Sequence, residues 1–361
     1  MDAERSVGSG ATRASAAAPN SGLMNEPARP LSVTPAPLSS RRTFAFHGTA
    51  AEFYPLFVRT VLLSIVTLGI YSFWGRAQMR RYLVSHLEFD GDRFEYHGTG
   101  GEMLRGALKL LAMGGLWFGI IFGASLLIPS TPEGEPADAG GALLSVVVVW
   151  VPLLLVWPFL VASSWRYRAS RTSWRGIRFS YRGSMRGFYG SWFKWLGIAI
   201  AMLGYGMPLF RARVRRYLIG HSYFGNLPFE STEDGSGLAT DFFLGGLLAY
   251  PTLGYMWQRF RAMERDHSFV NTSIEKATLW YSGTAGGLWK LNVAMTALII
   301  VTLGLAWPWK EIMRYQYFAE TTSLYGTADL DRAVQQMVAS PASADEFDGI
   351  LDDSGSFGLE I

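Results

Sequence analysis

The sequence predicts a mainly α-helical, polytopic membrane protein whose membrane helices form internally repeated units, with short β-hairpin-like segments between them. Three observations support this prediction. Hydrophobic residues make up 49% of the 361 residues, aromatic residues 14% and charged residues only 17%, a balance typical of membrane proteins. Long apolar runs follow one another along the chain, and a spanning helix needs about 20 apolar residues. The same residue pattern also returns at fixed intervals.

The stretch from Thr67 to Gly98 shows the recurring pattern most clearly. An apolar run ends on Tyr and Trp, which favour the membrane interface, and then passes into arginines and a strand-like segment. Parts of it return 135 and 235 residues later, and such fixed offsets predict a unit copied within the chain. The residues of this repeated interface motif are Gly69, Tyr71, Trp74, Arg80, Arg81, Tyr82, Arg215, Arg216 and Tyr217.

These residues also carry a family resemblance. The order Gly-Thr, apolar run, Thr-Leu-Gly-Ile-Tyr, Trp, basic run, Arg-Arg-Tyr and Phe-x-Gly-x-x-Phe-x-Tyr resembles the YjgN family of bacterial inner-membrane proteins, also called domain of unknown function 898. The resemblance covers roughly Phe44 to Gly326. It implies a multi-pass inner-membrane location and no known catalytic residues. The second copy has Gly206 where the first has Tyr71, so no site can be fully equivalent in all copies.

Composition excludes several kinds of site. The net charge of +3 is modest, so nucleic-acid binding is not indicated. The chain has no cysteine, which excludes disulfides, thiolate metal sites and a cysteine nucleophile. No metal-binding histidine motif and no complete nucleotide-binding fingerprint is present. We therefore expect no metal, no cofactor and no catalytic residue.

The chain divides into three parts by composition. Residues 1–40 are rich in Ala, Ser and Pro, and we expect a disordered tail there. Residues 41–326 hold about six apolar segments and form the repeated membrane domain. Residues 327–361 turn acidic, and we expect a second disordered tail. The apolar segments are Tyr54–Trp74, Leu108–Ile128, Ala142–Ser164, Trp192–Phe210, Phe242–Trp257 and Leu291–Trp309.

The distribution of charge predicts how these segments are oriented in the membrane. The loop Pro129–Gly141 has acidic residues but no Lys or Arg, whereas Arg166–Arg186 is rich in Arg, so we expect only the latter in the cytoplasm. If every apolar run spans once, Arg211–Arg216 falls outside the cytoplasm, against the positive-inside rule. Alternatively, some runs are re-entrant and break at residues such as Gly204 and Pro251. Simple spanning is the expectation, because re-entrant segments are rarer.

Three cations recur at matched positions. Arg59, Lys109 and Lys194 each follow a turn glycine by eleven residues. A ring of cations at one depth would hold an anion or a lipid phosphate, since charges inside membranes are costly and usually functional. Alternatively, each cation extends to the headgroups and serves no common site. Both interpretations stay open from the sequence.

The second apolar run carries glycines at four-residue spacing, Gly115, Gly119 and Gly123. Glycines on one helix face let a neighbouring helix approach closely. The spacing predicts helix packing, either within the chain or between protomers of a homo-oligomer.

Three functional hypotheses follow. Internal repeats are common in transporters, which favours transport or permeation of a small solute across the bacterial inner membrane. The alternative is a non-catalytic membrane module that binds anionic lipid headgroups or protein partners. An enzyme is the weakest hypothesis, because no acid–base or metal constellation is present. Cations lining a cavity would favour transport, and outward-facing cations would favour the module.

Overall fold

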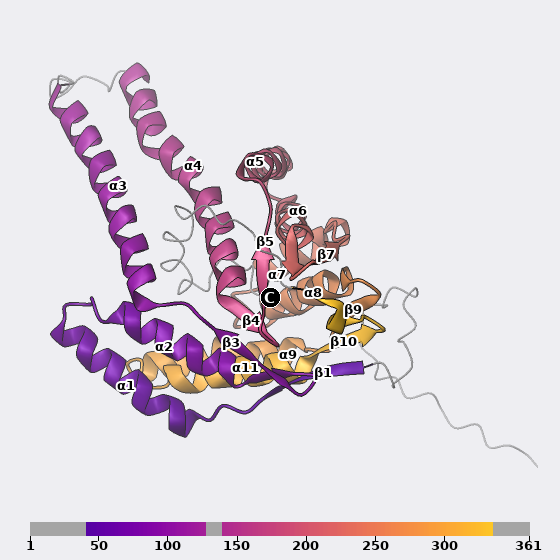
Figure 1. The fold of residues 1–361 in the computed structure, drawn as a ribbon. Coiled ribbons are helices and arrows are strands. Elements are labelled where there is room, and N and C mark those ends of the chain that lie inside the picture. The colour runs from indigo at the N-terminus through magenta and orange to yellow at the C-terminus, as the bar shows by residue number, and fades with distance from the viewer. Residues whose placement is uncertain (1–40, 128–138, 335–361) are drawn as a thin grey trace, which may run out of the picture. The chain divides into compact units, whose positions relative to one another are not determined.

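The computed structural model describes residues 41–127 and 139–334 (Figure 1). The expected tail 1–40, residues 335–361 of the expected tail 327–361, and most of the acidic loop lie outside these residues, so what the sequence predicts for them stays a prediction.

The centre of the described structure is a closed barrel of ten antiparallel strands. Strands that follow one another along the chain pair in order, and β10 pairs with β1 to close the sheet. Closure removes the exposed edges at which other chains would pair. The strands are β1 (Arg41–Phe46), β2 (Leu87–Phe89), β3 (Asp92–Tyr96), β4 (Thr172–Trp174), β5 (Ile177–Tyr181), β6 (Ser222–Phe224), β7 (Leu227–Ser231), β8 (Thr272–Ile274), β9 (Ala277–Tyr281) and β10 (Thr322–Gly326).

The tight strand turns follow from local sequence. Asp90 and Gly91 have φ values of 54° and 87°, and Arg175 and Gly176 have values of 52° and 74°. Two successive left-handed residues are the mark of a two-residue hairpin turn whose twist matches that of its strands. Asp-Gly is a preferred pair for this turn, which explains why the β2–β3 turn lies there.

Helical pairs connect the strand hairpins. The helices are α1 (Ala50–Val66), α2 (Ser72–Ser85), α3 (Gly100–Leu127), α4 (Ala139–Arg171), α5 (Met185–Ala201), α6 (Met207–Gly220), α7 (Ala239–Leu247), α8 (Tyr255–Val270), α9 (Ala285–Trp289), α10 (Met295–Val301) and α11 (Trp307–Thr321). A π-helical turn, Lys290–Ala294, joins α9 to α10. Because the strands alternate in direction, the helical connections all leave one end of the barrel and the strand turns lie at the other.

The predicted fold class is wrong in two respects. Short strands do occur between the helices, but they join into one closed barrel and are not separate hairpins. Among the described helices, only α3 and α4 are both long and apolar enough to span a membrane, in the windows Gly100–Gly123 and Val147–Arg171. The structure therefore does not support six spanning segments. Figure 1 shows α3 and α4 side by side, and Trp117 Nε1 donates to Val148 O at 3.4 Å.

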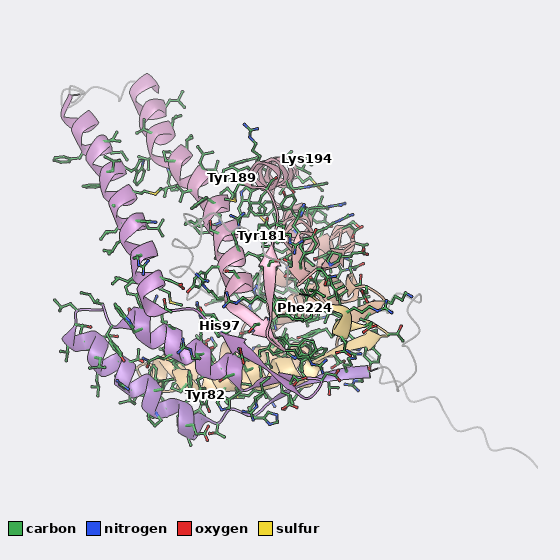
Figure 2. All side chains as sticks on the ribbon, viewed as in Figure 1. Tyr82, His97, Tyr181, Tyr189, Lys194 and Phe224 are labelled. Atoms are coloured by element: carbon green, nitrogen blue, oxygen red, sulfur yellow. The ribbon has the colours of Figure 1, made fainter. Side chains whose placement is uncertain are left out.

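The barrel interior is filled with aromatic rings. Phe44 and Phe89 have ring centroids 4.5 Å apart, and Trp174 and Phe179 lie 5.5 Å and 5.1 Å from Phe224. Phe224 is buried in this cluster (Figure 2). Trp174 Nε1 donates to the carbonyl of Phe89 at 3.2 Å, so its polar atom is satisfied inside the core.

The residues after β10 cover the strand-turn end of the barrel. Ala328, Leu330 and Ala333 are buried in the same aromatic core. Asp331 accepts from Arg175 Nη1 at 2.8 Å, and the Val334 N–H donates to Asn226 Oδ1 at 2.8 Å. These contacts fix residues 327–334 across several strand turns and fill that end of the barrel.

Candidate membrane-facing site

Four of the described helical pairs turn at a Leu-Gly dipeptide in the same unusual conformation. The leucines have φ values of 48° to 53° and the glycines 81° to 94°. A left-handed conformation costs a non-glycine residue roughly 1–2 kcal/mol. Each leucine is nonetheless between 74% and 97% exposed, and an apolar side chain held outward on a strained backbone indicates an apolar environment. The four turns, which we call the leucine tips, are centred on Leu68, Leu203, Leu253 and Leu303.

The backbone at these tips forms its hydrogen bonds internally. The Gly69 N–H donates to Ser64 O at 2.6 Å, closing the last turn of α1. The Tyr71 N–H donates to Thr67 Oγ1 at 2.9 Å, so the threonine satisfies a donor at the start of α2. Thr252 Oγ1 and Thr302 Oγ1 accept in the same way from the N–H groups of Met256 and Ala306, at 3.2 Å and 3.1 Å. The tips therefore need little water to satisfy their donors.

More apolar side chains are exposed beside each tip. On the first pair, Val61, Leu62, Ile65, Val66 and Ile70 are between 40% and 78% exposed. The other pairs expose Ile200, Met202, Phe243, Leu247, Ile300, Val301 and Leu305. The spanning helices expose the same kind of surface, including Leu116, Phe118, Leu153 and Leu154. A water-facing surface rarely gathers so many large apolar side chains.

The helical pairs overlap around the barrel end. Tyr205, beside one tip, hydrogen-bonds Thr240 at the start of the next pair at 2.8 Å. Trp289 Nε1 donates to the carbonyl of the tip residue Leu253 at 2.9 Å. The ring centroids of Tyr54 and Trp309 lie 5.9 Å apart, which joins the last pair to the first. In three of the four pairs, residues at or beside the tip thus contact the base of the next pair.

The three matched cations lie on three different helices, α1, α3 and α5. Arg59 and Lys194 are exposed, and Lys109 is half-buried. Lys194 points away from α5 in Figure 2, with Nζ 5.2 Å from the ring centroid of Trp195. The structure thus places two of the three on outward faces.

The predicted packing glycines lie on a face of α3 that the described residues leave open. A Cβ built at Gly115, Gly119 or Gly123 would meet none of their atoms within 4 Å. Packing between protomers stays a prediction for this face. A close helix approach occurs instead at Gly75 on α2, where a Cβ would lie 2.0 Å from the Thr60 side chain.

The predicted interface motif divides into residues with different roles. Gly69 and Tyr71 belong to a tip, and Trp74 is 37% exposed on α2. Arg81 Nη2 donates to the carbonyl of Gly98 at 3.5 Å, and Arg80 is half-buried with polar partners. Tyr82 and Tyr217 hydrogen-bond the carbonyls of Thr49 and Ser184, at 3.3 Å and 3.0 Å, which ties the end of each pair to its beginning. Arg216 is exposed.

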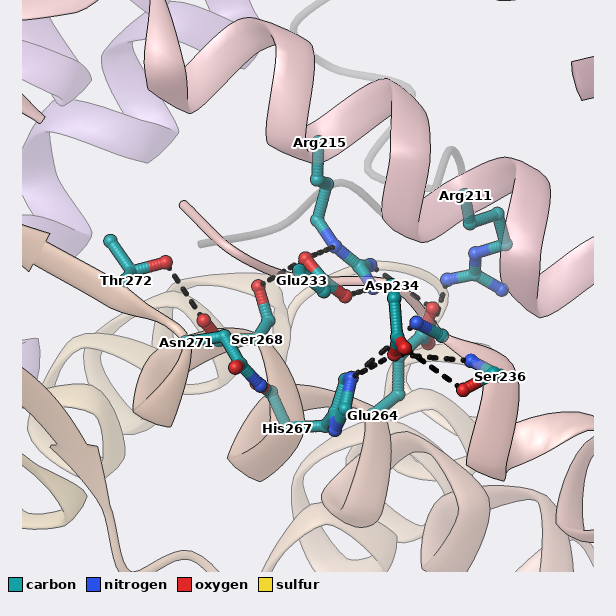
Figure 3. A network of polar contacts seen from close by, with 11 residues as sticks. Arg211, Arg215, Glu233, Asp234, Ser236, Glu264, His267, Ser268, Asn271 and Thr272 are labelled. Atoms are coloured by element: carbon teal, nitrogen blue, oxygen red, sulfur yellow. Dashed lines mark hydrogen bonds and ion pairs between the residues drawn. The ribbon is translucent and has the colours of Figure 1, made fainter. Parts of the chain in front are cut away.

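Arg215, the remaining residue of the motif, lies inside a buried ionic cluster (Figure 3). Arg215 is 5% exposed and donates to Glu233, which is fully buried, at 2.6 Å. Its other amino group pairs with Glu264 at 3.0 Å, and Arg211 pairs with the same carboxylate at 2.9 Å. Ser268 Oγ also donates to Glu233, at 3.1 Å. The two arginines balance the two carboxylates.

The loop after β7 extends this cluster toward the surface. Asp234 accepts from the Ser236 hydroxyl at 2.9 Å and lies 3.5 Å from His267 Nε2. Partial burial acts to raise the pKa of Asp234, but the bonds from Ser236 and the nearby His267 hold that pKa below its ordinary value. The carboxylate is therefore ionised at neutral pH, and it also accepts from the Ser236 N–H at 3.3 Å.

The sequence analysis missed this cluster, although a signal for it exists. In the other four pairs, a glycine follows the strand by two residues, and its added Cβ would collide with an aromatic side chain at 2.1–2.5 Å. After β7 that position is Glu233, and the aromatic residue two positions earlier is replaced by Ser231. The polar residues Ser231 and Glu233 therefore stand where the other pairs have an aromatic residue and a glycine. This difference in the sequence marks the site at which the Arg215 side chain is buried. The glycines that follow the strand in those four pairs are Gly48, Gly98, Gly183 and Gly283.

Comparison with known proteins confirms the family resemblance that the sequence predicts. The model of a family of bacterial proteins of unknown function, DUF898, matches residues 41–250 and 237–350. The chain belongs to this family. The inner membrane protein YjgN of Escherichia coli O157:H7 is 33% identical over 131 residues, and its counterpart in Escherichia coli K12 is 32% identical over 131 residues.

The YjgN protein of Salmonella typhimurium is 26% identical over 132 residues. These matches cover 36% of this chain and only 29% of each relative. No solved structure matches the chain. Membership of the DUF898 family, the names of these relatives and the two helices of spanning length together identify a membrane protein.

Proposed function

We propose that this DUF898 protein is a non-catalytic module of the bacterial inner membrane that binds anionic lipid headgroups. The α3–α4 pair crosses the bilayer twice, and the barrel lies at the cytoplasmic surface, where the arginine-rich segments of the sequence satisfy the positive-inside rule. The outward position of Arg59 and Lys194 is the observation that carries the proposal. Cations on an outer face contact lipid, whereas cations that serve a transported anion would line an interior path.

The filled barrel offers no path for a solute through its own interior. Aromatic rings occupy the barrel core, and residues 327–334 cover its strand-turn end. A solute would have to displace both to pass through the barrel. The enzymatic alternative has no support from metal ligands, because no group of three or more His, Asp and Glu side chains suited to a metal lies in the described residues.

The proposal is tested by removing the three cations together. A variant with Arg59, Lys109 and Lys194 replaced by Gln is purified beside the wild type, and bound lipids are counted by native mass spectrometry. Each contact near the surface contributes on the order of 1 kcal/mol, so retention of anionic lipid is expected to fall by up to about a hundredfold.

A charge-matched control separates headgroup binding from a loss of net charge. It replaces three cations near the strand-turn end, Arg93, Lys276 and Arg332, by Gln and should keep its lipid. Equal lipid retention in the wild type and the first variant would show that its cations only extend to the headgroups, and would refute the proposed function.

A further inference from the structure

We infer that the four leucine tips are re-entrant: they enter the acyl-chain region of the cytoplasmic leaflet and return without crossing the bilayer. The occupant of the exposed apolar surface around Leu68, Leu203, Leu253 and Leu303 is therefore the acyl chains of one leaflet. This inference rests on the membrane topology of the proposed function but not on retention of anionic lipid by the three cations.

Strand topology places the tips on the membrane side of the barrel. All described helical connections leave one barrel end, and the α3–α4 pair is among them. When α3 and α4 cross the bilayer, the bases of the shorter pairs necessarily start from the same surface. The apolar environment next to their exposed tips is then the membrane lipid.

Helix length sets an upper limit on the depth of insertion. Arg59 precedes Leu68 by nine residues, and Lys194 precedes Leu203 by the same number. At 1.5 Å per residue, nine residues span about 14 Å, whereas the hydrocarbon core is about 30 Å thick. With the cations at the headgroups, a tip reaches the bilayer midplane at most. The contacts of the Leu203 and Leu253 tips with the base of the next pair reduce that depth further.

The hydrogen bonds within each tip lower the free-energy cost of inserting its backbone into hydrocarbon. An unsatisfied N–H in hydrocarbon costs several kcal/mol, which normally excludes irregular turns from lipid. The Leu68 and Ile70 N–H groups donate to Ile65 O and Thr67 O at 3.3 Å and 3.2 Å, and the Leu303 and Leu305 groups repeat this pattern. The threonine hydroxyl satisfies a further donor. The turn thus exposes side chains to lipid while keeping its donors paired.

The charge rule favours the same topology. If the apolar run Trp192–Phe210 crossed the membrane once, Arg211–Arg216 would lie outside the cytoplasm, against the positive-inside rule. A re-entrant pair returns this segment to the barrel surface, where Arg215 pairs with Glu233 of the loop after β7.

Insertion depth can be measured at single cysteines, because the chain contains none of its own. Nitroxide labels at Leu68→Cys and Leu303→Cys are compared in phosphatidylethanolamine–phosphatidylglycerol vesicles, using oxygen and a water-soluble nickel chelate as relaxing agents. Lys276→Cys at a strand turn gives the aqueous reference, and Leu154→Cys on α4 gives the bilayer reference.

We expect both tip labels to resemble Leu154→Cys, with high oxygen and low nickel accessibility. Nickel accessibility equal to that of Lys276→Cys would place the tips in water and overturn the inference. Labelling of Leu68→Cys in intact cells by an impermeant thiol reagent would show a complete crossing and also overturn it. Neither readout measures lipid retention, so failure here and failure of the headgroup proposal are distinguishable.

Discussion

Replacing Arg215 by Met is expected to destabilise the protein strongly. Arg215 is 5% exposed and makes charged hydrogen bonds to Glu233 at 2.6 Å and to Glu264 at 3.0 Å. Both carboxylates are nearly or fully buried, at 0% and 2% exposure. The variant would leave one arginine, Arg211, to balance two buried carboxylates.

The size of the effect follows from this imbalance. Removing one partner of a buried ion pair costs about 3–5 kcal/mol, because the remaining charge has neither a partner nor water. For a domain of this size, a loss of that order lowers the Tm by on the order of 10 °C. Unfolding in detergent can be followed by the intrinsic fluorescence of the 13 tryptophans.

Two further variants make this prediction specific. Arg216→Met changes the neighbouring exposed residue of the same helix and should leave the Tm nearly unchanged. The double variant Arg215→Met/Glu233→Met retains the Arg211–Glu264 pair and should recover at least half of the loss. A single variant as stable as the wild type, or a double variant whose loss is the sum of two large losses, would refute the reasoning.

Two more predictions follow from the packing. Gly75→Leu should lower the Tm sharply, because its Cβ would lie 2.0 Å from the Thr60 side chain. Gly119→Leu, on the open face of α3, should leave the Tm of the monomer unchanged. Equal changes in Tm for the two variants, measured in detergent, would contradict this contrast. Burial, with the hydrogen bond to Tyr317, raises the pKa of Tyr281 above its ordinary value, so its stabilising contribution is complete below about pH 10 and is lost as pH rises through the folded-state pKa. Tyr281→Phe should therefore reduce the alkaline loss of Tm, and an unchanged slope above pH 10 would count against that assignment.

The sequence marked the residues of three tips as a recurring motif, but simple spanning was the expectation for the runs that contain them, and the barrel was not predicted. Thr67-Leu68-Gly69 and its later counterparts stood out because the same turn chemistry is needed each time, a left-handed leucine followed by a left-handed glycine. The sequence indicated short β-hairpin-like segments but not their bounds or their closure into one sheet, because β2, β4, β6 and β8 have only three residues each. An alternation over three residues is too short to distinguish from a loop. Closure also joins Arg41 to Tyr325, a pairing that no local pattern reveals.

The candidate site was predictable to a similar extent. The spacing of Arg59 and Lys194 gave their shared place on the helices, because spacing along a helix is a local property. The matched positions of Arg80 and Arg215 in the sequence did not predict their different environments. Arg215 is buried because Glu233 and Glu264 approach it from other elements, and such an approach exists only in three dimensions.

The pairing of the first strand fixes the order in which the barrel can form as the chain is synthesised. Arg41 to Thr43 pair with β10, whereas Phe44 to Phe46 pair with β2, so the two halves of β1 belong to opposite ends of the chain. The second half finds its partner after some forty residues, but the first half waits until residue 326 has left the ribosome. Until then the incomplete sheet keeps two open edges, and loop-closure entropy opposes the last pairing. With the topology inferred above, helical pairs that enter the bilayer earlier would hold these edges near each other, and the membrane would assist the closing step of the barrel.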